Sequence, residues 1–138
     1  MADSVLLDTC AAIWLMNGEP LSDPGVAAIR DAQSANAGVY VSPFTAWEIG
    51  TLVSKARLHL TLSPEAWFDT LLAKRGVRLS PMTPKVLLAS TSLPGSPPSD
   101  PADRIIAATA RIFGHVVITR DRKLLEYARQ GQLRVKAC

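Results

Sequence analysis

The feature that most constrains this chain is the alternation of short apolar runs with longer helical patterns. The runs are Val5-Leu6-Leu7, Val39-Tyr40-Val41, Val77-Arg78-Leu79, Val116-Val117-Ile118 and Leu133-Arg134-Val135. Each is short, apolar and rich in β-branched residues, as expected of a buried strand. Strands that alternate with helices favour a parallel sheet covered on both faces, with right-handed crossovers. The sequence therefore predicts a three-layer α/β/α fold with a central parallel sheet of about five short strands.

The helix starts are marked by proline. Five of the ten prolines follow a capping residue, in the pairs Asp23-Pro24, Ser42-Pro43, Ser63-Pro64, Thr83-Pro84 and Asp100-Pro101. A cap followed by proline begins a helix well, because the N–H that proline lacks would have no helical partner there. The helix after Ser63 is predicted to stop before Gly76, and the helix after Asp100 to stop at Gly114.

Length and composition limit the class of protein. The chain has 138 residues, of which 48% are hydrophobic and 20% charged. This size suits one domain, residues 1–138, and the composition excludes a disordered chain. No apolar run is long enough to span a bilayer, and the N-terminus carries Asp3 where a signal peptide has basic residues. We expect a single soluble domain in the cytoplasm.

Positive charge is concentrated toward the C-terminus, although the formal net charge is only +3. From residue 104 onward the basic residues are Arg104, Arg111, Arg120, Arg122, Lys123, Arg129, Arg134 and Lys136, against the acids Asp121 and Glu126. A basic third of this kind suits a polyanionic partner. An ordinary solvated surface is the simpler interpretation of the same residues.

Three acidic residues lie where ligands bind in parallel sheets, beyond the carboxyl ends of the strands. Asp8 directly follows the first strand, and Asp121 lies just past the fourth. Asp103 lies in the first turn of the helix capped by Asp100. Glu48 adds a fourth acid, in the second turn of the helix that begins at Ser42-Pro43.

Each acid also has a purely structural interpretation. Asp8 and Asp121 could cap the helices that follow them, and Asp103 could complete a capping box behind Asp100. A cap of this kind stabilises a helix by about 1 kcal/mol without any chemistry. Glu48 lies past the first turn, and its structural alternative is a surface ion pair with Lys55 or Arg57 of its own helix or with another basic side chain.

Together, the four acids favour a metal site. Two unit charges about 4 Å apart repel by about 4 kcal/mol at an effective dielectric of 20, so a cluster needs a cation or protons. Ligands that are all oxygen suit a hard ion, Mg²⁺ or Mn²⁺, which commonly bridges to a phosphate of the substrate. The chemistry expected of such a site is metal-assisted hydrolysis of a phosphodiester.

Four segments, taken in order, resemble the PIN-domain nucleases, and in particular the VapC-like toxins of toxin-antitoxin pairs. They are Leu6-Leu7-Asp8-Thr9, Ser42-Pro43-Phe44-Thr45-Ala46-Trp47-Glu48-Ile49, Asp100-Pro101-Ala102-Asp103-Arg104 and Ile118-Thr119-Arg120-Asp121. The resemblance implies a Mg²⁺- or Mn²⁺-dependent ribonuclease with Asp8, Glu48, Asp103 and Asp121 as catalytic, metal-binding residues. It also implies an RNA substrate, self-association as a homodimer or larger assembly, and inhibition by a small cognate antitoxin protein.

Asp100 competes with Asp103 for the third acidic position. The spacing to the last aspartate in the resembled family favours Asp103, and Asp100 has a sufficient role as the N-cap before Pro101. The hydroxyls of Thr9 and Thr119 are expected to hold a neighbouring carboxylate or a water.

Other polar and aromatic residues near these motifs have less certain roles. Phosphate contacts and ion pairs with the acids remain equal alternatives for three arginines, Arg104, Arg120 and Arg122. The three tryptophans, Trp14, Trp47 and Trp67, fall in amphipathic patterns and are predicted to be core.

Two other classes of protein were considered. A catalytically silent PIN-like module could bind RNA or protein through the same basic surface, although the presence of all four acids argues against it. A receiver-like signalling domain would need a lysine after a late strand, and Lys123 follows Asp121 too closely. The glycine-rich loops of nucleotide-binding folds are absent from the sequence.

Overall fold

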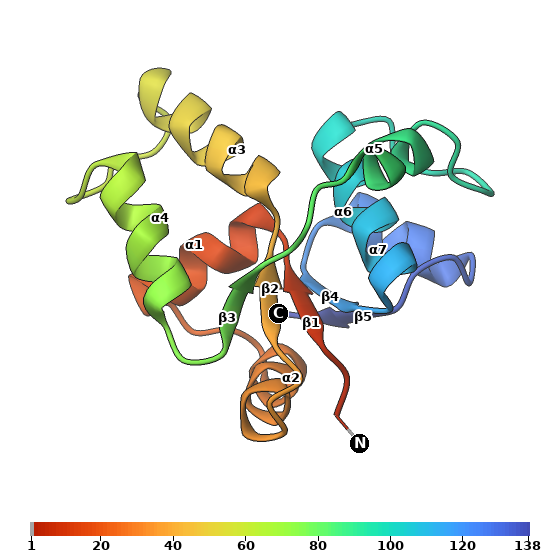
Figure 1. Ribbon diagram of the computed structural model, residues 1–138, viewed down its shortest axis with the longest axis horizontal. Helices are drawn as coiled ribbons and strands as arrows, with labels where there is room; N and C mark the ends of the chain where they lie inside the picture. Colours follow the sequence, from red (N-terminus) through yellow and green to blue (C-terminus); the bar gives the residue numbers. More distant parts are fainter. Residues whose placement is uncertain (1) are drawn as a thin grey trace.

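The computed structural model describes residues 2–138 and contains alternating strands and helices (Figure 1). In chain order the elements are β1 (Val5–Leu7), α1 (Thr9–Asn17), α2 (Asp23–Ser34), β2 (Val39–Val41), α3 (Pro43–Ser54), α4 (Pro64–Ala73), β3 (Val77–Leu79), α5 (Pro84–Ser90), α6 (Pro101–Phe113), β4 (Val116–Thr119), α7 (Arg122–Arg129) and β5 (Val135–Ala137). The predicted α/β class is confirmed.

The strands form one five-stranded sheet in the order β3-β2-β1-β4-β5, and every neighbouring pair is parallel. The chain runs outward from β1 through β2 to β3, then returns to pair β4 with the other side of β1. The direction of winding therefore reverses between β1 and β4. In parallel sheets this reversal point is where ligands bind, outside the carboxyl ends of the strands.

Alternate strand residues face two separate cores. Leu7 and Ile118 point to the side covered by α1, α2, α3 and α4, whereas Leu6 and Val117 point to the side covered by α6 and α7. This alternation follows from the two-residue period of a strand. Figure 1 shows α1, α3 and α4 on one side of the molecule and α5, α6 and α7 on the other. The three-layer prediction is confirmed.

Four of the five predicted helix caps are confirmed. Ser42, Ser63, Thr83 and Asp100 each accept a hydrogen bond from a backbone N–H in the first turn of α3, α4, α5 and α6. The predicted stop at Gly114 is also confirmed, because Gly114 ends α6 with a φ of 73°, in the left-handed region that suits glycine.

The predicted cap at Asp23 is wrong by one residue. The structure begins α2 at Asp23, so that Ser22 takes the cap position. The Ser22 hydroxyl makes no capping bond and instead donates to the carbonyl oxygen of Ala137 at 2.9 Å. The cap residue of α2 is therefore tied to the end of β5, 115 residues away in the chain, instead of to the first turn of its own helix.

The last strand is displaced from its predicted position. We predicted residues 133–135, whereas β5 spans Val135–Ala137 and pairs Val135 with Val117. Leu133, which prompted the prediction, is buried in the core beneath α6 and α7 without being part of the strand. At the sheet edge β5 is only partly buried, so it lacks the apolar pattern that identifies the inner strands.

One predicted core residue is wrong. Trp67 is buried in the core as predicted, but Trp47 is 61% exposed and stacks on Phe44 with ring centroids 5.1 Å apart. Thr45 and Ile49 form the buried side of α3. Trp47 lies between them in the sequence and faces the opposite, solvent-exposed side of the helix. Within residues 2–138, no helix is both long and apolar enough to cross a membrane.

Candidate active site

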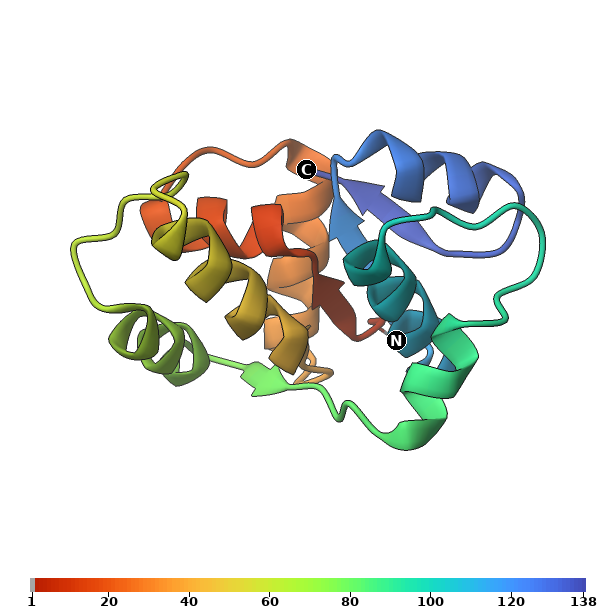
Figure 2. The ribbon, with the colours of Figure 1, turned by 90° about the horizontal axis from the view of Figure 1, so that it is seen from above.

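The carboxyl ends of β1 and β4 bring two predicted site residues together at the point where the winding reverses. Asp8 directly follows β1, and Asp121 lies two residues beyond the end of β4. Seen from above, α1, α3 and α6 surround this end of the sheet (Figure 2). Glu48 comes from α3 and Asp103 from the first turn of α6. All four acids therefore reach one place from separate elements.

A cleft of about 240 Å³ contains all four of these carboxylates. Its lining residues are Asp8, Thr9, Cys10, Trp14, Glu48, Ala102, Asp103, Ile106, Arg120 and Asp121. Asp100, the competitor of Asp103, is not among them. The structure thus assembles the set predicted from the sequence.

Asp8 caps α1 and faces the cleft at the same time. Its Oδ1 accepts a hydrogen bond from the Ala11 N–H at 2.7 Å, and its Oδ2 accepts one from the Thr119 hydroxyl. The Thr119 hydroxyl also accepts the Asp121 N–H at 2.9 Å, so it links the acids that follow β1 and β4. Burial raises the pKa of Asp8 above its ordinary value, and the hydrogen bonds from Thr119 and Ala11 partly offset that rise.

Glu48 is held by α1 rather than by a cation of its own helix. The Thr9 hydroxyl donates to Glu48 Oε1, and Thr9 and Thr45 also lie within hydrogen-bond distance, at 3.3 Å. Neither Lys55 nor Arg57 pairs with Glu48, because the two ion pairs found within residues 2–138 lie elsewhere. The ion-pair alternative for Glu48 is therefore wrong. Burial raises the pKa of Glu48, and the Thr9 hydroxyl works against that rise.

Asp103 and Asp121 face each other across the cleft. Burial, together with the negative charge and the hydrogen bond of Asp121, raises the pKa of Asp103 to about 8. Asp121 also caps α7, accepting the Lys123 N–H at 3.3 Å. Asp100 caps α6 and accepts the Asp103 N–H at 3.1 Å, as predicted. Capping and a place in the cleft are thus compatible for Asp121. Asp100 caps α6 outside the cleft lining, although its charge contributes to the raised pKa of Glu48 and Asp103.

The predicted hydroxyl contacts are confirmed, and the three arginines have different surroundings. Arg104 donates to the carbonyl oxygens of Ser90, at 2.7 Å, and Pro98, at 3.1 Å, so it fixes the chain before α6. Arg120 lies in the cleft, with its guanidinium carbon 3.5 Å from the centre of the Trp14 ring. Arg122 is exposed at the start of α7. Among residues 2–138, none of the three forms an ion pair with a cleft acid.

Cys10 and Trp14 line the cleft, although neither was predicted from the sequence to belong to it. They are four residues apart on α1 and therefore share a helix face, which begins beside Asp8. Their spacing from Asp8, which caps α1, could have predicted from the sequence that both side chains line the cleft. Burial and the surrounding carboxylates raise the pKa of Cys10 to about 11, so its thiol stays protonated at neutral pH.

The donor chemistry of the cleft fits a hard cation. Apart from the protonated Cys10 thiol, its acidic groups are carboxylates, and the raised pKa of Asp103 reflects burial together with the negative charge concentrated there. Over residues 2–138, no three His, Cys, Asp or Glu side chains converge closely enough to form a finished coordination shell. Instead, hydroxyl and amide donors occupy oxygens of Asp8 and Glu48. An ion would have to compete with those hydrogen bonds.

Fold and cleft together define a class: three-layer α/β/α proteins with an acidic site at the carboxyl ends of a parallel sheet. Within that class, the family model of the PIN domain matches residues 5–130. The chain belongs to the PIN domain family.

One relative agrees with this assignment, and solved structures share the fold. The chain is 35% identical over 123 residues to Ribonuclease VapC22 of Mycobacterium tuberculosis, a match that covers 88% of this chain and 89% of that protein. Among solved structures, the fold is similar to a chain of Rickettsia felis VapBC2 bound to a promoter DNA fragment, with a TM-score of 0.70, 16% identity and coverage of 97% and 98% of the two chains. It is also similar to a chain of DNA-bound VapBC from Salmonella typhimurium, with a TM-score of 0.60, 20% identity and coverage of 99% and 98%.

Proposed function

We propose that this PIN-domain chain is a ribonuclease that hydrolyses RNA phosphodiesters with Mg²⁺ or Mn²⁺, and that it acts as the toxin of a toxin-antitoxin pair. The observation that carries the proposal is the assembly of Asp8, Glu48, Asp103 and Asp121 in one cleft. The 35% identity to a protein named as a ribonuclease, over most of both chains, supports the same activity. A substrate of cellular RNA would also place its action in the cytoplasm.

Each part of the cleft has a task in this proposal. A divalent cation held by the four carboxylates would activate water and neutralise charge on the phosphoryl oxygens. The Thr119 and Thr9 hydroxyls fix the positions of the Asp8 and Glu48 carboxylates in the cleft, and the ion would compete with them for the carboxylate oxygens. Asp103, with a pKa of about 8, keeps a proton at neutral pH while the charge around it is uncompensated. Arg120, at the side of the cleft, presents N–H donors suited to a phosphate oxygen.

Purified protein, free of any partner, tests this directly. We expect it to cleave total cellular RNA when Mg²⁺ or Mn²⁺ is present and to lose this activity in excess chelator, because oxygen ligands hold such ions loosely. Mapping the ends of the products would identify the RNA and the cleavage site. Full activity in chelator would reject the metal mechanism.

The proposal includes a small antitoxin protein that blocks the acidic cleft with a basic side chain. The concentrated carboxylates of the cleft are complementary to such a group. Co-expression with the product of a neighbouring small gene should yield a complex whose nuclease activity is far below that of the free protein. A complex as active as the free chain would reject inhibition through the cleft.

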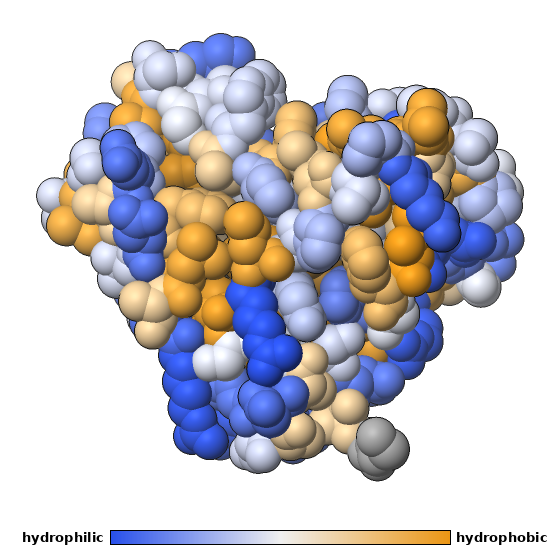
Figure 3. All heavy atoms as spheres, in the orientation of Figure 1, coloured by the Kyte–Doolittle hydropathy of each residue, from blue (hydrophilic) through white to orange (hydrophobic). Residues whose placement is uncertain are grey.

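We also propose that the chain associates with itself. Large apolar side chains are exposed, including Trp47 at 61% and Leu88 at 69%, and hydrophobic patches are visible over the α4–β3 region and the α5–α6 side (Figure 3). Light scattering should give a mass of at least a dimer, and Trp47→Ser with Leu88→Ser should lower it. A monomer at high concentration would contradict this part of the proposal.

A further inference from the structure

A second hollow, of about 390 Å³, opens beside the acidic cleft. It lies between the loop residues 96–98 and the side chains of Arg122, Lys123, Glu126 and Arg129 on α7. We refer to it as the proline groove, after Pro97 and Pro98 in its wall. None of its lining residues lines the acidic cleft.

The walls of the proline groove continue into the walls of the cleft. On one side, Pro98 is followed after three residues by Pro101, the start of α6, and then by the cleft residues Ala102 and Asp103. On the other side, Arg122 directly follows the cleft residue Asp121. A linear polymer with one bond in the cleft would therefore extend naturally into the groove.

The loop wall is fixed in place by hydrogen bonds to α7 and the residues that follow it. Gln130 accepts the Ser96 N–H at 2.9 Å and donates to the Ser96 carbonyl at 3.1 Å. The Tyr127 hydroxyl donates to the Pro94 carbonyl at 2.6 Å. A surface loop tied down by such contacts is pre-organised, which lowers the entropy cost of binding to it.

The same loop is also tied to α6. Arg104 donates to the Pro98 carbonyl at 3.1 Å, which holds the end of the loop nearest the cleft. Pro97 is half-buried and presents rigid apolar surface with no N–H to satisfy, and the buried Pro98 supports it from behind. This wall suits the face of a base or a ribose rather than a charged group.

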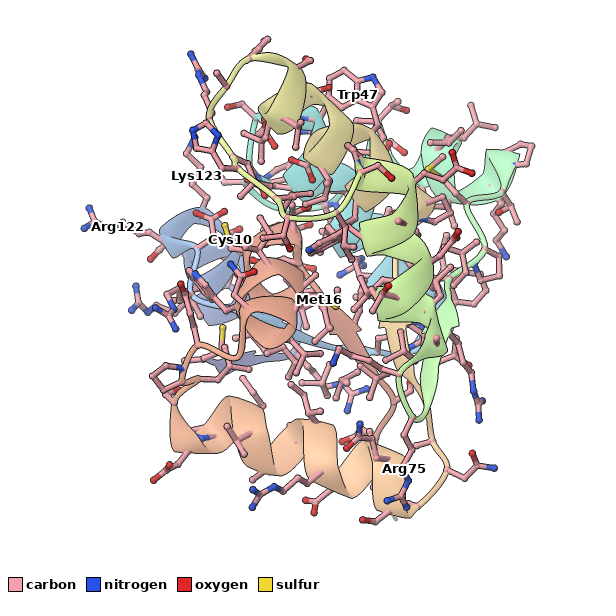
Figure 4. The ribbon with its side chains drawn as sticks, turned by 90° about the vertical axis from the view of Figure 1, so that its left-hand side faces the viewer. Cys10, Met16, Trp47, Arg75, Arg122 and Lys123 are labelled. Atoms are coloured by element: carbon pink, nitrogen blue, oxygen red, sulfur yellow. The ribbon has the colours of Figure 1, made fainter. Side chains whose placement is uncertain are left out.

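The α7 wall is basic, and its two cations nearest the cleft have no partner within residues 2–138. Arg129 pairs with Glu126 at 2.8 Å, but neither Arg122 nor Lys123 donates a side-chain hydrogen bond or forms an ion pair there. Figure 4 shows both side chains reaching outward from α7, on the side where Cys10 of the cleft lies. They are free to meet an anion.

The placement of these cations is unfavourable for the helix itself. Arg122 and Lys123 are the first two residues of α7, whose first turn holds no acid. Positive charge at the positive end of the helix dipole is unfavourable, and the Asp121 carboxylate at the cap position offsets it only in part. A bound phosphate backbone would reverse that penalty.

We propose that the proline groove binds the RNA nucleotides adjacent to the scissile bond. Arg122 and Lys123 contact backbone phosphates there, and Pro97 packs against a base or ribose. The inference rests on the proposed ribonuclease function and adds to it a preference for RNA that extends beyond the cleft on this side. Its charge matches a polyanion better than the basic side chain expected of an antitoxin.

The test compares a short RNA that spans only the scissile bond with the same RNA extended on both sides. The groove variant carries Arg122→Gln and Lys123→Gln, and the matched control carries Arg30→Gln and Arg75→Gln. Arg30 and Arg75 are exposed, and Figure 4 shows Arg75 at the opposite end of the molecule from Arg122 and Lys123. All four substitutions are on the surface, and melting curves would confirm that both proteins fold.

We expect the groove variant to lose about tenfold in kcat/KM on the extended RNA, equivalent to about 1.4 kcal/mol. The short RNA should be cleaved as by the parent protein, and the control variant should behave as the parent on both. The salt dependence of extended-RNA affinity should fall in slope by about 1.4 for two lost phosphate contacts on a single strand.

Three results would overturn the proposal that the proline groove binds RNA. An equal loss in the control variant would assign the effect to net charge, and an equal loss on the short RNA would place both cations at the cleft. Unchanged RNA affinity with weakened antitoxin binding would assign the surface to that protein.

Failure of the nuclease proposal is distinguishable from failure of the groove. A parent protein that cleaves neither RNA would reject the nuclease proposal, and the groove would then be decided by the anisotropy-measured affinities of the same two RNAs. Equal affinities of parent and groove variant for the extended RNA would reject it.

Discussion

The Arg120 guanidinium carbon lies 3.5 Å above the centre of the Trp14 ring, inside a cleft that also contains four carboxylates. No ion pair joins Arg120 to any of those acids in the described chain, residues 2–138. The stacking contact thus holds a cation at the side of the cleft and leaves the carboxylate oxygens to other partners. Arg120 and Trp14 come from opposite ends of the chain, and the sheet brings them together.

The Arg120–Trp14 contact can be measured with a double-mutant cycle. Arg120→Ala, Trp14→Leu and the double variant should give a coupling free energy of about 0.5–1 kcal/mol, the range for a partly exposed cation over an aromatic ring. Urea denaturation of the four proteins supplies the values. Strictly additive effects would show that the contact contributes nothing.

The Thr119 hydroxyl should matter more than its size suggests. Thr119→Val keeps the shape of the side chain but removes the donor to Asp8 Oδ2 and the acceptor of the Asp121 N–H. Leaving these groups without partners should cost about 1–3 kcal/mol of unfolding free energy. It should also raise the pKa of Asp8 further, because the hydroxyl bond lowers it.

Thr109→Val is the matched control for Thr119→Val. Thr109 is equally buried, but its hydroxyl donates to Ile105 within the same helix, and removing it leaves no isolated carboxylate. Chemical denaturation should show a clear loss for Thr119→Val and little change for Thr109→Val. Equal losses of unfolding free energy in the two variants would contradict a stabilising bridge from Thr119 to Asp8 and Asp121.

Some of the site could be predicted because it depends on local sequence. Asp8 directly follows β1, and Asp121 lies two residues beyond β4. The apolar runs of these inner strands are unambiguous, so the place of both acids at the sheet edge followed from the sheet itself. The proline caps fixed the starts of α3 and α6 and therefore the positions of Glu48 and Asp103 along those helices. The same local signals gave four of the five strands.

Features that depend on contacts distant in the sequence could not be predicted in this way. The helical periodicity wrongly predicted Trp47 to be core. A periodic pattern alone does not say which side of a helix packs against the rest of the protein. Similarly, Leu133 is buried outside the strand that it seemed to mark. The proline groove depends on hydrogen bonds between Gln130 and Ser96, which are 34 residues apart.

The repulsion within the cleft predicts a pH-dependent gain in stability for Asp103→Asn. The pKa of Asp103 rises from 3.8 to about 8 on folding, so the native protein keeps a proton that the unfolded chain loses. Its contribution is fully present below pH 3.8 and is lost as the pH rises through 8. Asparagine cannot lose that proton, and the variant should therefore become increasingly more stable than the parent as the pH rises.

Melting curves from pH 4 to pH 9 in excess chelator would test the Asp103 prediction, with Asp100→Asn as the control, since the range spans the shift from 3.8 to about 8. Asparagine caps a helix about as well as aspartate, so the control should follow the parent at every pH. A difference between Asp103→Asn and the parent that does not vary with pH would contradict the raised pKa.

We expect the free energy of unfolding to fall in mild acid because of the buried His115. It is 5% exposed, receives or donates a 2.7 Å hydrogen bond with the Ser4 hydroxyl, and stacks on Tyr40. Burial, with the nearby charge of Arg134, lowers its pKa from 6.5 to about 4. Between those values the unfolded chain binds a proton that the native protein does not, so stability falls as the pH drops through this window.

His115→Phe keeps an aromatic ring against Tyr40 and removes the titration. The full shift corresponds to at most about 3 kcal/mol, at about 1.4 kcal/mol for each pKa unit. Unfolding free energies of the parent should fall relative to those of His115→Phe between pH 6.5 and pH 4, the window set by the two pKa values. Parallel curves for the two proteins would contradict the account of His115.

The most direct test of the central claim, that the cleft acids hold a catalytic cation, is an RNA cleavage assay at fixed Mg²⁺ on Asp8→Asn, Glu48→Gln, Asp103→Asn, Asp121→Asn and the capping control Asp100→Asn. Each change keeps the shape of the side chain but replaces one carboxylate oxygen with an amide N–H donor and removes the negative charge, which at the four cleft positions is that of a proposed metal ligand. The account predicts that the four cleft variants lose most of their activity while melting no lower than the parent in chelator, and that Asp100→Asn stays active. Cleft variants as active as the parent, or an inactive Asp100→Asn beside an active Asp103→Asn, would contradict it.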